Sequence, residues 1–410
     1  MKIKNGTKKG LESISVPHRH NWIRLLVAGG SILFLILVIA LTLLPAAFPA
    51  FGANMADFLR VIFGAQPVAR LESTSFKLHD ELNRFLYKDG KPQIDWNGPA
   101  QPETLRPSGS AKLASPIVPN SSALSGGEAV SAAPQIGWQA YGPEVNGAPV
   151  LARVMLTLDP HRPYAGVALV RMDLSKLALH MMPGTLEPAH PAQLTPLIPN
   201  PGVIPSADLN TLVAAFNGGF KAVHGHYGMM VNGVTLLPPL PNIATVAIYR
   251  DGHVQIGVWG RDIVQSPDLI SFRQNCPPLI DAGQLNPGLD NNQGAWGYTS
   301  NTDVTWRTAL GITQDGHYLI YAVGNGTSTA TLAQALQDAG AYSAMQLDIN
   351  QYYAHFDIFP PAAQGSQMEG KPLLNKMINI PQLYLTPNVR DFFYLTVQGS
   401  ASLGQKTAGG

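Results

Sequence analysis

Charged side chains at the ends of strands are the first candidates for chemistry in this chain. The residues from Arg307 to Asp348 read as a strand, an Asp-Gly turn, a second strand, a helix and a third strand. Loops beside strand ends are where sites are commonly built. A guanidinium can hold a phosphate, and a carboxylate can serve as a general acid, a general base or a nucleophile. The plain alternatives are a structural ion pair of Arg307 with Asp303 or Asp348, and a turn-capping role for Asp348.

A second group of candidates follows a predicted buried strand at residues 212–216. The motif Asn217-Gly218-Gly219-Phe220 comes directly after that strand. Glycines allow the backbone to approach a ligand closely, and the Asn217 amide offers both a donor and an acceptor. The same glycines would suit a tight turn that needs positive φ. The motif is not a phosphate-binding loop of the Gly-Lys-Ser/Thr type, because that signature is missing.

Three polar side chains come next: Lys221, His224 and His226. Imidazole titrates near neutral pH, so His224 is a candidate for acid–base chemistry, and Lys221 is a candidate for substrate binding. A His-x-His spacing places both rings on one face of a strand, which a metal could use. No third ligand is evident, and the single cysteine, Cys276, excludes both a cysteine-based zinc site and an intrachain disulfide. We therefore expect neither a metal nor another cofactor.

The residues around Asp348 add further polar and aromatic groups. Asn350 is a candidate substrate contact, and Tyr352, Tyr353 and His355 could form a platform for stacking a sugar or could fill the core. A glycosidase usually needs a pair of carboxylates. Asp348 is one, and the sequence offers three second carboxylates without choosing among them: Asp281, Asp303 and Asp357.

Short strands are the main elements that must position these residues. Asn-Gly or Asp-Gly pairs at residues 232–233, 251–252 and 315–316 predict three hairpins, because these pairs tolerate the positive φ of tight turns. The strand–helix–strand run from Tyr318 to Asp348 could be a crossover. The pattern predicts an α+β domain with mixed, mostly antiparallel sheets and few helices.

Helices are expected in only three places within that domain: residues 206–212, 267–274 and 332–339. Thr331 with Gln334 three residues later predicts a capping box at the start of the last one.

The composition indicates a membrane segment and a linker in addition to the domain. Charged residues are only 13% of the 410-residue chain, whereas a soluble domain usually carries about a quarter. Leu25–Leu44 contains no charge, and about twenty apolar residues span a bilayer core. The basic residues before it predict a cytoplasmic N-terminus and an extracytoplasmic domain, with a cleaved signal peptide as the alternative. The net charge of +1 gives no reason to expect nucleic acid as a partner.

The chain therefore divides into five predicted segments. They are a basic tail (1–24), a transmembrane signal-anchor (25–44), juxtamembrane helices with a flexible linker rich in Pro, Ser, Ala and Gly (45–134), a globular domain (135–400) and a frayed tail (401–410). Two helical patterns between Asn54 and Tyr87, broken at Pro67, could pack on the domain or on a second copy, or could form a solvated stalk. The sequence does not give the oligomeric state.

Three stretches carry a resemblance to a known family. They are NGGF at Asn217–Phe220, RTALGITQDGHYLI at Arg307–Ile320, and the helix TLAQALQDAGA that leads to QLD at Gln346–Asp348. Over residues 151–394 the chain resembles the phosphodiester glycosidase family, which includes the lysosomal uncovering enzyme and bacterial exopolysaccharide-associated proteins. The resemblance implies removal of a sugar, usually an N-acetylhexosamine, that is attached through a phosphodiester.

The resemblance also implies roles for single residues. Asn217 would contact the sugar or the phosphate, Arg307 would hold the phosphate, and Asp348 would lie at the reacting centre. The chain departs from the family after Asp348, where the family usually continues Gly-Gly-Gly-Ser and this sequence reads Ile349-Asn350-Gln351. Side chains in place of glycines make a close backbone approach to an anion harder, and Asn350 and Gln351 become new polar contacts.

The expected function is a membrane-anchored, extracytoplasmic, glycosidase-like hydrolase of a sugar phosphodiester or a related cell-envelope glycan. The alternative on the same fold is a catalytically silent protein that binds a glycan or assists exopolysaccharide assembly. A third hypothesis is a metal-dependent hydrolase that uses His224, His226 and Asp348. The expected partners are a carbohydrate or sugar-phosphate substrate and, through residues 25–44, a lipid bilayer.

Overall fold

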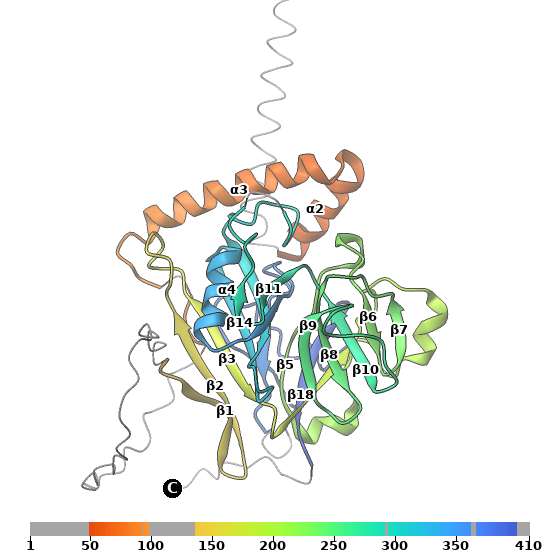
Figure 1. The fold of residues 1–410 in the computed structure, drawn as a ribbon. Coiled ribbons are helices and arrows are strands. Elements are labelled where there is room, and N and C mark those ends of the chain that lie inside the picture. Colours follow the sequence, from red (N-terminus) through yellow and green to blue (C-terminus); the bar gives the residue numbers. More distant parts are fainter. Residues whose placement is uncertain (1–48, 93, 98–135, 292–293, 362–365, 400–410) are drawn as a thin grey trace, which may run out of the picture.

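The computed structural model describes residues 49–92, 94–97, 136–291, 294–361 and 366–399 (Figure 1). The predicted membrane segment at 25–44 and most of the predicted linker lie outside these residues. Within the described part of the chain, no helix combines the length and the apolar character that crossing a bilayer requires.

Three sheets build the globular part. The largest has the order β1-β2-β3-β14-β13-β15-β11-β12, with β1 (Gln139–Val145), β2 (Ala148–Leu156), β3 (Val167–Asp173), β11 (Pro278–Asp281), β12 (Gln284–Leu285), β13 (Thr305–Ile312), β14 (Tyr318–Thr327) and β15 (Ser343–Gln346). The second has the order β7-β6-β10-β8-β9, with β6 (Met229–Val231), β7 (Val234–Leu237), β8 (Ala244–Tyr249), β9 (Val254–Val258) and β10 (Leu269–Gln274). The third has the order β17-β16-β5-β18-β4, with β4 (Leu177–Met182), β5 (Leu212–Asn217), β16 (Phe356–Ile358), β17 (Lys371–Pro372) and β18 (Phe392–Val397).

The α+β class is confirmed, but the sheets are not mixed as predicted. Every ladder between the described strands is antiparallel. The only parallel pairing in this part of the chain is an isolated bridge between Trp259 and Ile263. One hydrophobic core joins all three sheets, and Phe216 of β5 lies near its centre, with its ring 5.3 to 5.8 Å from the rings of Tyr321, Phe356 and Phe393.

The three predicted hairpins are present, as β6–β7, β8–β9 and β13–β14. Gly233, Gly252 and Gly316 each have positive φ in these turns, which is the conformation that glycine adopts without steric cost. The predicted crossover is also present, because β14 and β15 both run antiparallel to β13, which lies between them. Helix α4 (Thr329–Asp338) connects these two strands.

Two predictions about helices are wrong. Within the predicted helix at residues 267–274, Leu269–Gln274 form strand β10 instead, since Phe272 and Arg273 pair with β6 and β8 in the second sheet. The cap of α4 is Ser328, whose Oγ accepts a hydrogen bond from the backbone N–H of Thr331, and no capping box starts at Thr331. Residues 206–211 form a 3₁₀ helix, close to the predicted position.

Two helices before the domain, α2 (Pro49–Phe63) and α3 (Ala65–Leu86), lie across one end of it (Figure 1). The break between them is at Gly64, with φ of 83°, and not at Pro67, because proline is tolerated in the first turn of a helix. Arg162 of the domain donates to both carboxylate oxygens of Asp80, at 2.6 and 2.5 Å. We refer to α2 and α3 together as the helical hairpin; of the three arrangements expected from the sequence, it packs on the domain.

Two oppositely charged neighbours, Arg390 and Asp391, precede β18 and are both buried. Asp391 accepts a hydrogen bond at 2.8 Å from Nε of Arg273 in β10, and another at 3.0 Å from the backbone N–H of Gly219. The backbone N–H of Gly218 donates to the Asp391 carbonyl at 3.0 Å. These contacts join the loop after β5, the start of β18 and the second sheet.

The buried ion pair of Arg273 with Asp391 explains the two glycines of the NGGF motif. Neither Gly218 nor Gly219 has positive φ, so a tight turn does not account for them. A Cβ on Gly218 would overlap with the Asp391 carboxylate, and a Cβ on Gly219 would lie 2.8 Å from Cζ of Arg273. Glycine is therefore needed at both positions because the buried ion pair leaves no space for a side chain.

We expect Gly218→Ala to lower the free energy of unfolding by about 3 kcal/mol, since the new methyl group must displace a buried, paired carboxylate. Urea unfolding of the two proteins measures the difference. Gly137→Ala is the control, because open space surrounds Gly137 and its substitution should change stability by less than about 0.5 kcal/mol. Equal stability of the two variants would contradict this explanation.

Candidate active site

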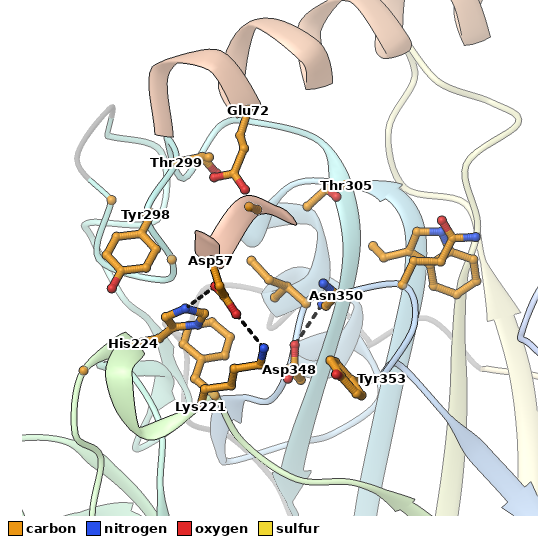
Figure 2. A pocket seen from close by; sticks show the side chains of 18 of the residues that line it. Asp57, Glu72, Lys221, His224, Tyr298, Thr299, Thr305, Asp348, Asn350 and Tyr353 are labelled. Carbon is orange, nitrogen blue, oxygen red and sulfur yellow. Dashed lines mark hydrogen bonds and ion pairs between the residues drawn. The ribbon is translucent and has the colours of Figure 1, made fainter. Parts of the chain in front are cut away.

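A pocket of about 480 Å³ lies between the helical hairpin and the domain (Figure 2). Polar side chains line it from both sides: Asp57, Arg60, Glu72 and Ser75 from the hairpin, and Lys221, His224, Tyr298, Thr299, Thr305, Asp348, Asn350, Gln351, Tyr353 and Arg390 from the domain. The pocket therefore contains six of the residues that the sequence indicated, namely Lys221, His224, Asp348, Asn350, Gln351 and Tyr353.

The Asp57 carboxylate lies against two of these predicted residues. One of its oxygens accepts from Lys221 Nζ at 2.5 Å, and the other lies 3.0 Å from Nε2 of His224 (Figure 2). Burial acts to raise the pKa of the Asp57 carboxyl, but the hydrogen bonds and charges of His224 and Lys221 outweigh it and hold that pKa well below its usual range. The two side chains thus form a site that already binds an anion.

A second ion pair crosses the hairpin. Arg60 of α2 donates to both oxygens of Glu72 in α3, at 2.6 and 2.7 Å, and also to Asp57 at 2.8 Å. Its guanidinium lies 4.9 Å from the centre of the Tyr298 ring. Burial raises the pKa of the Glu72 carboxyl, although the charge of Arg60 opposes this. Arg60 therefore orients both hairpin carboxylates that line the pocket.

Asp348 is held in place through all of its acceptor groups. Its Oδ2 accepts from Arg390 at 2.5 Å, and its Oδ1 accepts from the backbone N–H of Asn350 at 2.9 Å. Its carbonyl accepts from the Thr308 hydroxyl at 2.6 Å. The Arg390 guanidinium lies 4.4 Å from the centre of the Tyr353 ring, so an aromatic face borders this carboxylate.

A smaller pocket of about 240 Å³ shares Asp348, Tyr353 and Arg390 with the first. The motif residues Asn217, Gly218 and Gly219 line this second pocket.

The polar groups of Asn217 are occupied within the protein. Its amide nitrogen donates to Thr308 Oγ1 and to the Gly218 carbonyl, and its oxygen accepts from the Tyr321 hydroxyl and the backbone N–H of His355. The expected sugar or phosphate contact by Asn217 would require these bonds to open. In the structure its side chain joins β5 to strands β13 and β14 of the largest sheet.

Arg307 does not lie where the sequence analysis expected it. It is fully buried, lines neither pocket, and donates to the Gln346 side chain and to backbone carbonyls that include those of Thr327 and Asp303. Burial lowers its pKa to about 10. The reason is strand alternation: Thr308, the next residue of β13, contacts Asp348, so Arg307 points to the opposite face of the sheet. It is a structural residue in this arrangement, and the ion pair with Asp348 is made by Arg390.

The three proposed second carboxylates also lie outside both pockets. Asp281 pairs with exposed Arg261, and Asp303 accepts from the backbone N–H of Ser300 in a turn. Asp357 is fully buried, and burial raises the pKa of its carboxyl to about 8. The carboxylates that accompany Asp348 in the larger pocket come from the hairpin.

The His-x-His metal hypothesis is not supported by the local structure. Residues 222–224 form a short 3₁₀ helix rather than a strand, and His226 has φ of 52° and is exposed outside the pocket. Across the described ranges, no three His, Cys, Asp or Glu side chains come together in a group that could hold a metal ion.

Several pocket residues were not identified from the sequence, and they differ in whether a local sequence pattern could have indicated them. Arg390 lies just before strand β18, so the strand-end argument used for Arg307 applied to it equally. Asp57, Arg60 and Glu72 lie in a segment that sequence composition assigns to a stalk or linker region. Only their packing against the domain shows that they line the pocket.

The comparison with protein families agrees with the resemblance seen in the sequence. The family model of phosphodiester glycosidases matches residues 210–348, and no curated protein matches the chain. A similar solved structure is the zebrafish N-acetylglucosamine-1-phosphodiester alpha-N-acetylglucosaminidase catalytic domain auto-inhibited by pro-peptide, with 16% identity, a TM-score of 0.40, and coverage of 64% of this chain and 88% of that chain. Another is a hypothetical protein from Synechocystis, with 13% identity, a TM-score of 0.33, and coverage of 62% and 64%.

The matched residues begin in the 3₁₀ helix before β5 and end at Asp348. They include the NGGF motif, Lys221, His224 and strands β13 to β15. The expected resemblance is thereby confirmed for this segment: residues 210–348 match the phosphodiester glycosidase family.

Proposed function

We propose that this chain is a glycosidase-like hydrolase that acts on a sugar phosphodiester or a related cell-envelope glycan. The observation that carries the proposal is that Asp348 lines the same pocket as Lys221 and His224, which together hold an anion. A carboxylate beside a cationic site suits a substrate whose reacting sugar bond adjoins a phosphate. The family match over residues 210–348 supports the same reaction class.

The phosphate end of the substrate would bind to Lys221 and His224. These groups now contact the two oxygens of Asp57, and phosphate oxygens accept the same charge-assisted hydrogen bonds. In this proposal Lys221 and His224 take the role that the resemblance gave to Arg307. Asp57 then competes with the substrate, because both anions need the same donors.

The sugar end would lie toward Asp348 and Tyr353. Asp348 would attack the anomeric carbon, or would activate a water for that attack, while Arg390 and Asn350 keep the carboxylate oriented. The departing phosphate carries negative charge that Lys221 and His224 can stabilise. A phosphate is a good leaving group, so this reaction depends less on a general acid than hydrolysis of an ordinary glycoside does.

The alternative, a catalytically silent glycan-binding or exopolysaccharide-assembly protein, has one specific observation in its favour. Ile349, Asn350 and Gln351 line the pocket where the resembled family carries glycines, and both oxygens of Asp348 are already bonded. A pocket with these side chains could bind a glycan without presenting a free nucleophile.

We also propose that the domain is exported and remains anchored in the membrane. The uncharged run Leu25–Leu44 and the basic residues before it support this topology. The substrate would then belong to the cell envelope.

Substitution of Asp348 tests its proposed role in the reaction. Asp348→Asn should reduce kcat at least about 100-fold, because the amide is a poor nucleophile and base, while the affinity for N-acetylglucosamine 1-phosphate changes little. The assay follows release of N-acetylglucosamine from the methyl phosphodiester of that sugar by the full-length protein. Asp281→Asn is the control, since its exposed carboxylate pairs with Arg261 away from the pocket. Undiminished turnover in Asp348→Asn would exclude Asp348 from the reaction, and binding without turnover in the unmodified protein would favour the silent alternative.

Substitution of Asp57 tests whether its carboxylate competes with the substrate phosphate. Asp57→Asn should tighten the binding of N-acetylglucosamine 1-phosphate about tenfold, because the neutral amide no longer competes for Lys221 and His224. Isothermal titration calorimetry measures the affinity. Glu81→Gln is the matched control: it removes one negative charge from an exposed position of the same hairpin, outside the pocket. Weaker binding in Asp57→Asn, or equal tightening in Glu81→Gln, would refute the competition.

A further inference from the structure

The outer surface of the helical hairpin is unusually apolar. Eight of the thirteen large hydrophobic side chains that are exposed in the described residues belong to it. Val61 near the end of α2 is 85% exposed and Phe85 near the end of α3 is 71% exposed. The other five are dispersed over several loops of the domain, which is ordinary for a soluble surface. Concentration on one element is typical of an interaction surface.

The apolar side chains of α3 form one stripe. Leu78, Leu82 and Phe85 are four and three residues apart, which is helical spacing. At 100° per residue, this stripe lies roughly 130° around the helix from Glu72 and Phe76, which line the pocket. The apolar stripe is exposed along the C-terminal half of α3, whereas Leu71 and Ser75, which lie at similar angles nearer the start of the helix, are buried.

The position of the hairpin in the chain indicates what covers this surface. Helix α2 begins at Pro49, five positions after the end of the uncharged run Leu25–Leu44. Five residues of extended chain reach at most about 18 Å. If that run spans the bilayer, Pro49, the first residue of the helical hairpin, lies within about 18 Å of the membrane surface. No such chain connection brings a second copy of the protein to this surface.

Charges of both signs lie beside the apolar stripe, and the two lysines among them fit a bilayer as the occupant. Lys77 and Lys88 are exposed on this part of the hairpin, as are the acidic Glu81 and Asp89. The Lys88 ammonium lies 5.9 Å from the centre of the Phe85 ring. An amphipathic helix that lies on a bilayer inserts its apolar side chains below the headgroups and directs lysines toward the lipid phosphates.

We propose that the helical hairpin docks on the outer surface of the lipid bilayer through Val61, Ile62 and Phe63 of α2 and Leu82, Phe85 and Leu86 of α3. The pocket on its other side is then held about one helix diameter, ~10 Å, from the lipid headgroups. This proposal rests on the proposed anchor but not on the proposed reaction, so it stands or fails independently of catalysis.

Spin labels on the full-length protein in lipid nanodiscs test the docking. Labels are placed at Val61→Cys and Leu82→Cys, with Val264→Cys, exposed on a domain loop, as the control. The native Cys276 is fully buried, so the unsubstituted protein should take up no label. Power-saturation measurements compare collisions with oxygen, which concentrates in lipid, and with a water-soluble nickel chelate. We expect the two hairpin labels to lose contact with the nickel chelate and to gain contact with oxygen, and the control label to show the reverse.

Two results would overturn the proposal. Hairpin labels that collide with the nickel chelate as often as the Val264 label does would show that water covers this surface. Hairpin labels shielded from both reagents, with dipolar coupling between labels of two copies that persists as protein is diluted into lipid, would identify a second copy as the occupant. Because neither measurement uses turnover, loss of activity in the Asp348 experiment would leave the outcome unchanged.

Discussion

The arrangement of this site depends on two buried ion pairs, one made by Arg390 and the other by Asp391. Neighbours in the chain, these residues pair with Asp348 after β15 and with Arg273 in β10. One dipeptide thus connects the ends of strands from all three sheets, next to the Gly218 backbone. Removing one partner of a buried ion pair typically costs 3–5 kcal/mol, because the remaining charge stays buried without compensation. The network therefore constrains both the fold and the position of the candidate reacting carboxylate.

A second electrostatic feature gives the pocket its proposed specificity. Lys221 and His224 belong to the domain, whereas the carboxylate between them, Asp57, comes from a helix more than 160 residues earlier in the chain. The hairpin thereby covers the site with an internal anion on one side and presents an apolar surface on the other. In the proposed function, a phosphate-bearing ligand at these two donors would displace Asp57, and its binding would therefore be coupled to the position of the helical hairpin.

Local signals in the sequence predicted much of the fold but only part of the site. The three β-hairpins were predicted from Asn-Gly and Asp-Gly pairs, whose backbone preference does not depend on the rest of the chain. Lys221, His224 and Asp348 were predicted because they follow strand ends closely, and all three line the larger pocket. Nothing local shows which face of β13 the pocket adjoins, so the sequence could not show that Arg307 lies outside it. Arg390 makes the ion pair with Asp348 from 42 residues away in the chain. Asp57 was missed for the same reason: its partners are distant, and tertiary packing alone brings them together.

The central claim is that Lys221 and His224 form the phosphate site and that Asp348 faces the sugar. A crystal structure of the protein with N-acetylglucosamine 1-phosphate tests it most directly. The account predicts phosphate oxygens within hydrogen-bonding distance of Lys221 Nζ and His224 Nε2, with Asp57 displaced from both and the sugar beside Tyr353 and Asp348. A ligand bound elsewhere, with the Asp57 carboxylate still held by Lys221 and His224, would contradict it.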